Sequence, residues 1–163
     1  MKLSLLFVYG TLKRNQPNYR LLMDKESGET TFVSNARTVQ KWPLIIASKY
    51  NIPYLLNKRG FGNQIFGELY YVNERKLNFL DEFEKCPQYY DRLQIPVYQM
   101  NENENTCNTT LNPWVYILSD FKESLLEHKM YESYDSRGSH GLRYVKREDQ
   151  HENYSTICDV KYT

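Results

Sequence analysis

The sequence predicts an α+β domain built around a small curled β-sheet or barrel. Two observations favour this class: about six short runs rich in apolar, β-branched and aromatic residues, and two stretches with helical character. Tyrosine is also frequent, with 15 Tyr against 7 Phe. Tyrosine suits half-buried sheets and pocket walls because its ring packs while its hydroxyl remains hydrogen-bonded. At 163 residues the chain is most simply one domain.

The first predicted strand covers residues 3–9, where a nearly continuous apolar run is closed by Gly10. Residues 30–39 alternate well enough between apolar and polar side chains to form a second strand. Residues 43–47 and 53–56 are short apolar runs that each begin with a proline. Proline cannot donate to a β-ladder, so these two runs are predicted to be strand fragments or bulged edge strands.

The strongest strand pattern is NQIFGELYYV, residues 63–72, which is rich in aromatic and β-branched side chains. Gly67 in its middle indicates either a bulge or the close approach of another group. The runs at 92–100 and 112–118 are predicted to pair as a hairpin. The polar, low-complexity segment 101–110 would form the loop between them.

Two helices are expected. The first is ERKLNFLDEFE, residues 74–84, whose acidic and straight-chain residues favour a helix. Asn73 is a good N-cap for it, and Pro87 stops it because the residue before a proline avoids the α region. A second short helix fits residues 120–130, and the polar chain beyond it is expected to lie on the domain as an ordered arm.

Composition excludes several classes of function. The net charge of +1 argues against nucleic-acid binding, which needs clustered surplus cations. No apolar run approaches the ~20 residues that span a bilayer, and the N-terminal run is short for a signal peptide and lacks a small-residue cleavage site. Cys86, Cys107 and Cys158 form neither a CxxC metal pair nor a disulfide framework. We therefore expect a protein of the reduced cytoplasm with no metal ion and no membrane partner.

One carboxylate breaks the pattern of the first helix. With Leu77 at zero on a helical wheel, Phe79, Leu80 and Phe83 fall at about 200°, 300° and 240°, and Glu84 falls at about 340°, within the apolar side. A carboxylate there must be neutralised, paired or placed at a cavity, and desolvation raises its pKa toward the range useful for proton transfer. The alternative is that the helix frays before Pro87 and this side chain reaches water or a structural ion pair.

Other candidate residues remain open. Cys86 and His140 could form a nucleophile and base, although nothing in their spacing supports this. Lys13 and Arg14 are expected to be solvated rather than to bind phosphate, because the Walker pattern is absent. Glu68 faces either a pocket or solvent.

Five blocks of sequence together resemble the gamma-glutamylamine cyclotransferases of the gamma-glutamyl cyclotransferase-like superfamily. In order along the chain they are VYGTLKRNQPNY, PLIIASKYNIPYLL, IFGELYYVNERKL, LNFLDEFEKCPQYYDR and SYDSRGSHGLRY. The resemblance covers about residues 3–147. It therefore implies a gamma-glutamyl cyclotransferase-like domain over residues 1–147 and a C-terminal extension of unknown role over 148–163.

The resemblance implies a mixed β-barrel with flanking helices, no cofactor, and a small-molecule gamma-glutamyl amine as the partner; we expect a monomer. These enzymes cyclise the glutamyl group of their substrate into 5-oxoproline, and gamma-glutamyl-epsilon-lysine from degraded transglutaminase cross-links is the favoured substrate. The family's acid/base glutamate falls on Glu84, and its substrate-binding loop falls on Tyr9, Gly10, Thr11 and Leu12.

The resemblance also carries two details. The arm at residues 134–144 is expected to close over one side of the pocket. Asn15 stands where the family often has glycine, and because asparagine tolerates a left-handed backbone the turn can survive.

A mechanism follows as a hypothesis. The substrate's own α-amine attacks the gamma carbon after Glu84 removes a proton from it. Backbone amides near Gly10 hold either the glutamyl carboxylate or the developing oxyanion. Two alternatives stay open: a cyclotransferase for other gamma-glutamyl amides or amino acids, and a catalytically silent binding protein on the same scaffold.

Overall fold

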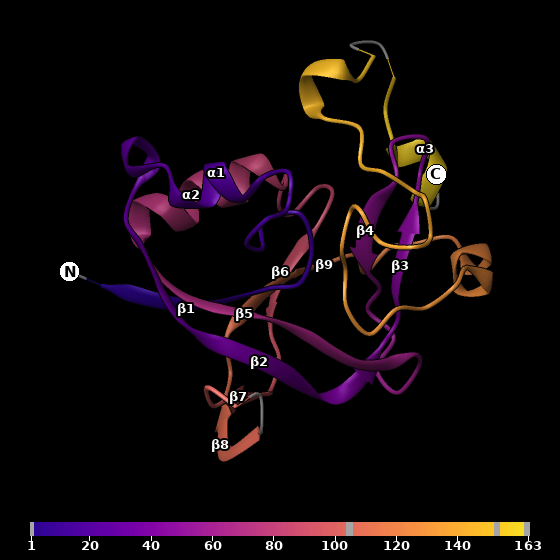
Figure 1. Cartoon of the computed structure of the whole chain (residues 1–163). Coiled ribbons are helices and arrows are strands. Elements are labelled where there is room, and N and C mark those ends of the chain that lie inside the picture. The colour runs from indigo at the N-terminus through magenta and orange to yellow at the C-terminus, as the bar shows by residue number, and fades with distance from the viewer. Residues whose placement is uncertain (1, 104–105, 152–153, 162–163) are drawn as a thin grey trace.

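The computed structural model describes residues 2–103, 106–151 and 154–161, and it confirms the α+β class (Figure 1). Residues 104 and 105 of the predicted loop, and 152, 153, 162 and 163 of the C-terminal extension, lie outside the described residues. The strands are β1 (Leu3–Val8), β2 (Thr30–Trp42), β3 (Leu44–Ala47), β4 (Ile52–Leu55), β5 (Asn63–Asn73), β6 (Asp91–Gln94), β7 (Val97–Met100), β8 (Thr106–Leu111) and β9 (Trp114–Ile117). The helices are α1 (Tyr19–Met23), α2 (Glu74–Phe83), α3 (Ile157–Val160) and the short 3₁₀ helices η1 (Lys25–Ser27), η2 (Glu123–Glu127) and η3 (Arg147–Asp149).

Seven strands form one mixed sheet in the order β6-β9-β1-β5-β2-β7-β8. The β1–β9 pair is parallel, and the other pairs in this sheet are antiparallel. The chain passes from β6 at one edge to β7, next to the other edge, through only Ile95 and Pro96. Such a short link is possible only if the sheet curls until its two ends approach each other. The curled, mixed sheet expected from the sequence is therefore confirmed.

The described chain contains more strands than the about six expected. The run 92–100 divides at Pro96, which cannot donate to a ladder, so its first half pairs with β9 and its second half pairs with β2 and β8. The predicted antiparallel pairing is thus confirmed for β6 and β9, but these strands do not form a hairpin, because β7 and β8 lie between them along the chain. Residues 101–110 were expected to be the hairpin loop. This is wrong for residues 106–110, which belong to β8 and pair with β7 through backbone hydrogen bonds that polar residues can also make.

The two proline-led runs form β3 and β4, which pair with each other in a separate two-stranded sheet. In β5, the predicted close approach at Gly67 is confirmed. A Cβ on this glycine would lie 2.5 Å from the carbonyl oxygen of Val8 and 2.5 Å from the ring of Phe7. The glycine therefore lets β1 pack tightly against β5 just before the β1 strand ends.

Helix α2 begins and ends close to the predicted bounds. The side chain of Asn73 accepts a hydrogen bond from the Lys76 amide, which confirms the N-cap, and the last helical residue is Phe83. The second predicted helix is shorter than expected, because residues 120–130 contain only the 3₁₀ helix η2. Helices α1 and α3 were not predicted; each is five residues or fewer, too short to show a helical period.

Figure 1 shows α1 and α2 lying together over β1 and β5, with the β3–β4 hairpin on the other side of the β1 exit. The C-terminal segment packs beside this hairpin. Val160 is fully buried in the same core cluster as Leu6 and Leu80, and Lys161 Nζ donates to the carbonyl of Gln88 at 2.9 Å. In the described part of the chain, no helix combines the length and hydrophobicity needed to cross a membrane.

Candidate active site

A pocket with a cavity volume of about 130 Å³ lies where the end of β1, the end of α2 and the β3–β4 hairpin meet. All five residues predicted for the site line it. The full lining is Phe7, Val8, Tyr9, Gly10, Thr11, Leu12, Asn18, Ile52, Pro53, Phe83, Glu84, Lys85, Tyr89, Tyr90, Tyr116, Tyr144, Arg147, Gln150 and Thr156.

The loop after β1 is held in shape by Asn18, a buried polar residue that the sequence did not single out. Its amide donates to the Thr11 carbonyl at 2.8 Å, and its Nδ2 lies within hydrogen-bond distance of Thr11 Oγ1 (3.0 Å) and the Tyr144 hydroxyl (3.2 Å). Asn15 adopts a φ of 64°, so asparagine takes the left-handed conformation expected there. A Cβ on Gly10 would lie 3.0 Å from Pro53 Cγ, so a glycine allows the loop to approach β4 closely.

The amides of this loop are available to a ligand. No described residue accepts a hydrogen bond from the backbone N–H of Gly10, Thr11 or Leu12, although all three residues line the pocket. Buried amides nearly always have a partner, which makes the amides of Gly10 and Leu12, two buried residues on either side of the half-buried Thr11, unusual. Backbone N–H groups are suitable donors to a carboxylate or to an oxyanion.

Glu84 is the residue that follows α2. Its amide donates to the Leu80 carbonyl at 2.8 Å, which continues the last helical turn and fixes where the side chain begins. The side chain is half-buried and lines the pocket, as the wheel predicted, rather than extending into solvent. Burial raises the pKa of its carboxyl to about 7, and the positive charge of Arg147 acts in the opposite direction.

No described residue donates a hydrogen bond to the Glu84 carboxylate. A carboxyl that lies in a pocket, titrates near neutrality and has no such protein donor can accept a proton from a ligand and return it. The arrangement therefore offers general acid/base chemistry beside a set of anion-binding amides.

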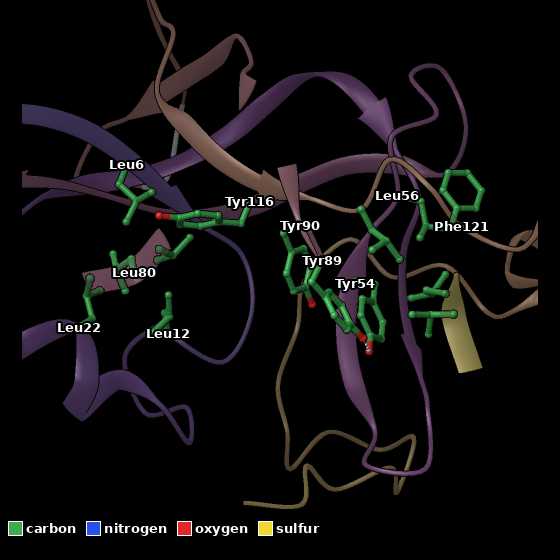
Figure 2. Close-up of a cluster of buried hydrophobic side chains, with 14 of the residues drawn as sticks. Leu6, Leu12, Leu22, Tyr54, Leu56, Leu80, Tyr89, Tyr90, Tyr116 and Phe121 are labelled. Carbon is green, nitrogen blue, oxygen red and sulfur yellow. Dashed lines mark hydrogen bonds between the residues drawn. The ribbon is translucent and has the colours of Figure 1, made fainter. Parts of the chain in front are cut away.

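Tyrosines form much of the remaining wall, in agreement with the composition. Tyr89 and Tyr90 line the pocket with their rings tilted against each other, at a centroid distance of 5.0 Å, and Tyr54, which does not line the pocket, stacks on both at 6.3 and 6.0 Å (Figure 2). The Tyr89 hydroxyl lies 2.7 Å from the Tyr54 hydroxyl and 2.6 Å from Thr156 Oγ1. Burial raises the pKa of the Tyr89 hydroxyl, so at neutral pH this wall is uncharged and hydrogen-bonding.

Tyr9 and Tyr116 connect the first strand to α2. The Tyr9 hydroxyl donates to the Tyr116 carbonyl at 2.8 Å, and the Tyr116 hydroxyl donates to Asp81 Oδ1 at 2.7 Å. Asp81 in turn forms an ion pair with Arg92 at 2.9 Å. Burial raises the pKa of both tyrosine hydroxyls, which therefore act as neutral donors that fix the back of the pocket.

Several other candidates lie outside the pocket. Glu68 does not line the pocket and is half-buried: its Oε1 accepts hydrogen bonds from the Arg14 amide at 2.9 Å and the Tyr70 hydroxyl at 3.0 Å, which anchors the loop. Arg14 is exposed as expected and lies over the Phe32 ring. The expectation of a solvated Lys13 is wrong, because its side chain is half-buried and desolvation lowers its pKa.

A Cys86–His140 pair receives no support, since neither residue lines the pocket. His140 Nε2 donates to the Asp135 carbonyl at 2.7 Å while its Nδ1 accepts from the Leu142 amide at 2.8 Å, so both ring nitrogens are used within the local turn. Burial raises the pKa of the Cys86 thiol, which makes it less reactive.

The arm at residues 134–144 docks against the loop after β1. The Ser136 amide donates to Gln16 Oε1 at 2.9 Å, and Tyr144 is the member of this arm that lines the pocket. The chain beyond the arm adds Arg147, Gln150 and Thr156 to the wall. These three residues belong to segments with no recognisable pattern, so no local signal in the sequence pointed to them.

The chain was compared with known proteins. The family model described as "Gamma-glutamyl cyclotransferase, AIG2-like" matches residues 6–136. The chain belongs to this family. Gamma-glutamylaminecyclotransferase from Homo sapiens is 42% identical over 153 residues, covering 91% of this chain and 100% of the relative. Gamma-glutamylaminecyclotransferase B from Danio rerio is 43% identical over 147 residues, covering 90% of this chain and 76% of the relative.

A solved structure agrees with these relatives. The crystal structure of an AIG2-like protein from Mus musculus has a TM-score of 0.85 and 39% identity, and the match covers 92% of this chain and 100% of that one. The expected family, its enzymatic class and the α+β fold are thereby confirmed.

Proposed function

We propose that this protein is a gamma-glutamylamine cyclotransferase that converts gamma-glutamyl-epsilon-lysine, a product of transglutaminase cross-link breakdown, to 5-oxoproline and free lysine. The observation that carries the proposal is the meeting in one pocket of a carboxyl with a pKa of about 7 and three backbone amides that no described residue accepts from. The relatives above 40% identity are named gamma-glutamylaminecyclotransferases, which supports the same reaction.

In the proposed mechanism, Glu84 in its carboxylate form removes a proton from the α-ammonium of the substrate. The freed amine attacks the gamma carbon, and a five-membered ring closes through a tetrahedral oxyanion. The carbon–nitrogen bond to lysine then breaks as the protonated Glu84 gives its proton to the departing amine. The ring nitrogen loses its second proton to solvent, and the released lysine amine takes one up from solvent. A carboxyl that titrates near neutrality suits both steps, because it takes up and releases the proton at similar cost.

The amides of Gly10, Thr11 and Leu12 would bind the glutamyl carboxylate or the oxyanion. Their positions are fixed by Asn18, so little reorganisation is needed as negative charge develops. The nucleophile belongs to the substrate, so neither a serine nor a cysteine of the protein is required. Holding the substrate folded, with its amine against the gamma carbon, supplies much of the acceleration. We propose no cofactor for this reaction and a reduced, cytoplasmic setting for the enzyme.

The direct test is to incubate the protein with gamma-glutamyl-epsilon-lysine and to measure 5-oxoproline and free lysine. Both products should appear in equal amounts. Glutamate in place of 5-oxoproline would indicate hydrolysis by water and would reject the cyclisation. Turnover of other gamma-glutamyl amides alone would favour the sister activity. Binding of the substrate without any product would favour a silent binding protein.

A further inference from the structure

The rim of the pocket carries two cations that the mechanism does not use. Lys85 follows Glu84, and Arg147 begins the 3₁₀ helix η3, more than sixty positions further along the chain. Both residues line the pocket, and both are exposed to solvent. Two distant segments thus place positive charge at the same opening.

These cations have no anionic partner in the described part of the protein. Neither forms an ion pair with a described residue, and among the residues lining the pocket the only acid is Glu84. A carboxyl with a pKa of about 7 compensates at most one of the two charges at neutral pH. The opening is therefore suited to a further anion.

Arg147 is also fixed in place. Its Nη2 donates to the Phe83 carbonyl at 3.0 Å, and its guanidinium carbon lies 3.9 Å from the centroid of the Phe83 ring. The other guanidinium N–H groups make no hydrogen bond to a described residue. A guanidinium held on one side with its remaining donors free is a suitable site for a carboxylate.

We propose that Arg147, assisted by Lys85, binds a carboxylate carried by the leaving amine and so selects amino-acid amines over plain amines. This inference rests on the proposed function, in which the amides after β1 bind the glutamyl end of the same substrate. The substrate gamma-glutamyl-epsilon-lysine carries one carboxylate at each end. The pocket offers backbone donors from the loop after β1 and side-chain cations from two other segments of the chain.

The test compares gamma-glutamyl-epsilon-lysine with gamma-glutamyl-cadaverine, which differs from it only in lacking the carboxylate of the leaving amine. The wild-type protein should prefer the lysine compound. At a pH above the acidic limb, where the carboxylate form of Glu84 predominates in both proteins, Arg147→Gln should lower kcat/KM for the lysine compound about 10-fold, mainly through KM, and change that for the cadaverine compound less than about twofold. Arg147→Lys should restore part of the loss because it keeps the charge but not the planar fork.

Lys146→Gln is the matched control, because it removes the same charge from the neighbouring exposed residue, which does not line the pocket. It should leave the preference unchanged. An equal loss for both substrates in Arg147→Gln would overturn the proposal. It would mean that Arg147 only supports the end of α2 or binds the glutamyl carboxylate, which both substrates share.

A second readout separates this inference from the proposed function. Dissociation constants for both compounds can be measured by calorimetry in Glu84→Gln, with and without Arg147→Gln, whether or not the wild-type protein shows turnover. An Arg147-dependent preference for the lysine compound supports the carboxylate site even if cyclisation fails. Equal affinity for the two compounds in the presence of Arg147 overturns it.

Discussion

The two ends of helix α2 each place one charged residue on the buried side, and the protein treats them in opposite ways. Lys76, in the first turn, is fully buried, and its Nζ donates to the carbonyls of Leu21 (3.0 Å) and Asp24 (2.8 Å) and to Ser27 Oγ (2.6 Å). Glu84, just after the last turn, receives no hydrogen bond from any described residue and opens into the pocket.

Because of this difference, Lys76 has a structural role, whereas Glu84 is suited to proton transfer. Three acceptors use the full donor capacity of an ammonium, so Lys76 connects α2 to the α1–η1 segment and is not available to a ligand. Desolvation shifts the pKa of each group toward its neutral form, lowering that of Lys76 and raising that of Glu84 to about 7. The value for Glu84 lies where a proton is exchanged readily at neutral pH.

The largest effect that the comparison predicts is on catalysis. Glu84→Gln should reduce kcat/KM for gamma-glutamyl-epsilon-lysine by about 1000-fold, because glutamine cannot transfer the proton. The circular dichroism spectrum should be unchanged. Glu82→Gln, an exposed neighbour in the same helix, should retain activity. If Glu84→Gln keeps kcat/KM within a few-fold of the wild-type value, Glu84 is not the catalytic acid/base.

Lys76→Met should show the reverse pattern, with a large effect on stability. The substitution keeps the bulk of the side chain but leaves buried acceptors without a donor, so the free energy of unfolding should fall by about 2–3 kcal/mol. Urea denaturation measures this, and Arg75→Met, at an exposed position, serves as the control. The folded variant should still turn over substrate. A selective loss of activity without loss of stability would contradict the structural role of Lys76.

Glu84→Gln should also reveal the cost of burying a carboxylate. The pKa is about 7 in the folded protein against an ordinary 4.5, so between these pH values the folded state binds more protons than the unfolded state. The contribution of Glu84 to the free energy of unfolding is therefore fully present below pH 4.5 and is lost as the pH rises to 7. The variant should therefore match wild type near pH 4 and exceed it by about 1–2 kcal/mol near pH 8, after allowance for partial exposure. Denaturation at both pH values tests this; identical pH dependence would mean that Glu84 is solvated.

The smallest predicted effect is that of Arg147 on the pKa of the Glu84 carboxyl. Because the charge of Arg147 lowers the pKa of the Glu84 carboxyl, Arg147→Gln should raise it. The catalytic form is the carboxylate, so the acidic limb of the kcat/KM profile should move to higher pH for both gamma-glutamyl substrates. If the acidic limb of the kcat/KM profile stays at the same pH, the charge of Arg147 does not act on the Glu84 carboxyl.

The sequence predicted much of this fold because its signals were local. The strands β1, β2 and β5, and the bounds of α2, follow from short-range patterns and from the Asn73 cap. Strand β8 and the 3₁₀ helix η2 were not predicted correctly. The first has polar residues that only a neighbouring strand could order, and the second is too short to show a period.

The candidate site divides in the same way. The wheel made Glu84 a candidate, and the family resemblance pointed to Glu84 and to the loop from Tyr9 to Leu12; both line the pocket. The same wheel places Lys76 at about 260°, also on the buried side, so periodicity could not tell the two charges apart. Nor could it find Asn18, whose importance lies in its bonds to Thr11 and Tyr144.

By itself, the sequence determined which residues are helical, which are extended, and that an acid stands on the buried side of α2. These follow from side-chain size, polarity and spacing along a single segment. Only the tertiary structure decided which buried charge is satisfied and which faces a cavity. It also brought the exit of β1 and the C-terminal segment to the same pocket. Hydrogen-bond partners and cavity walls come from residues far apart in the chain, and their distances depend on how the whole sheet curls.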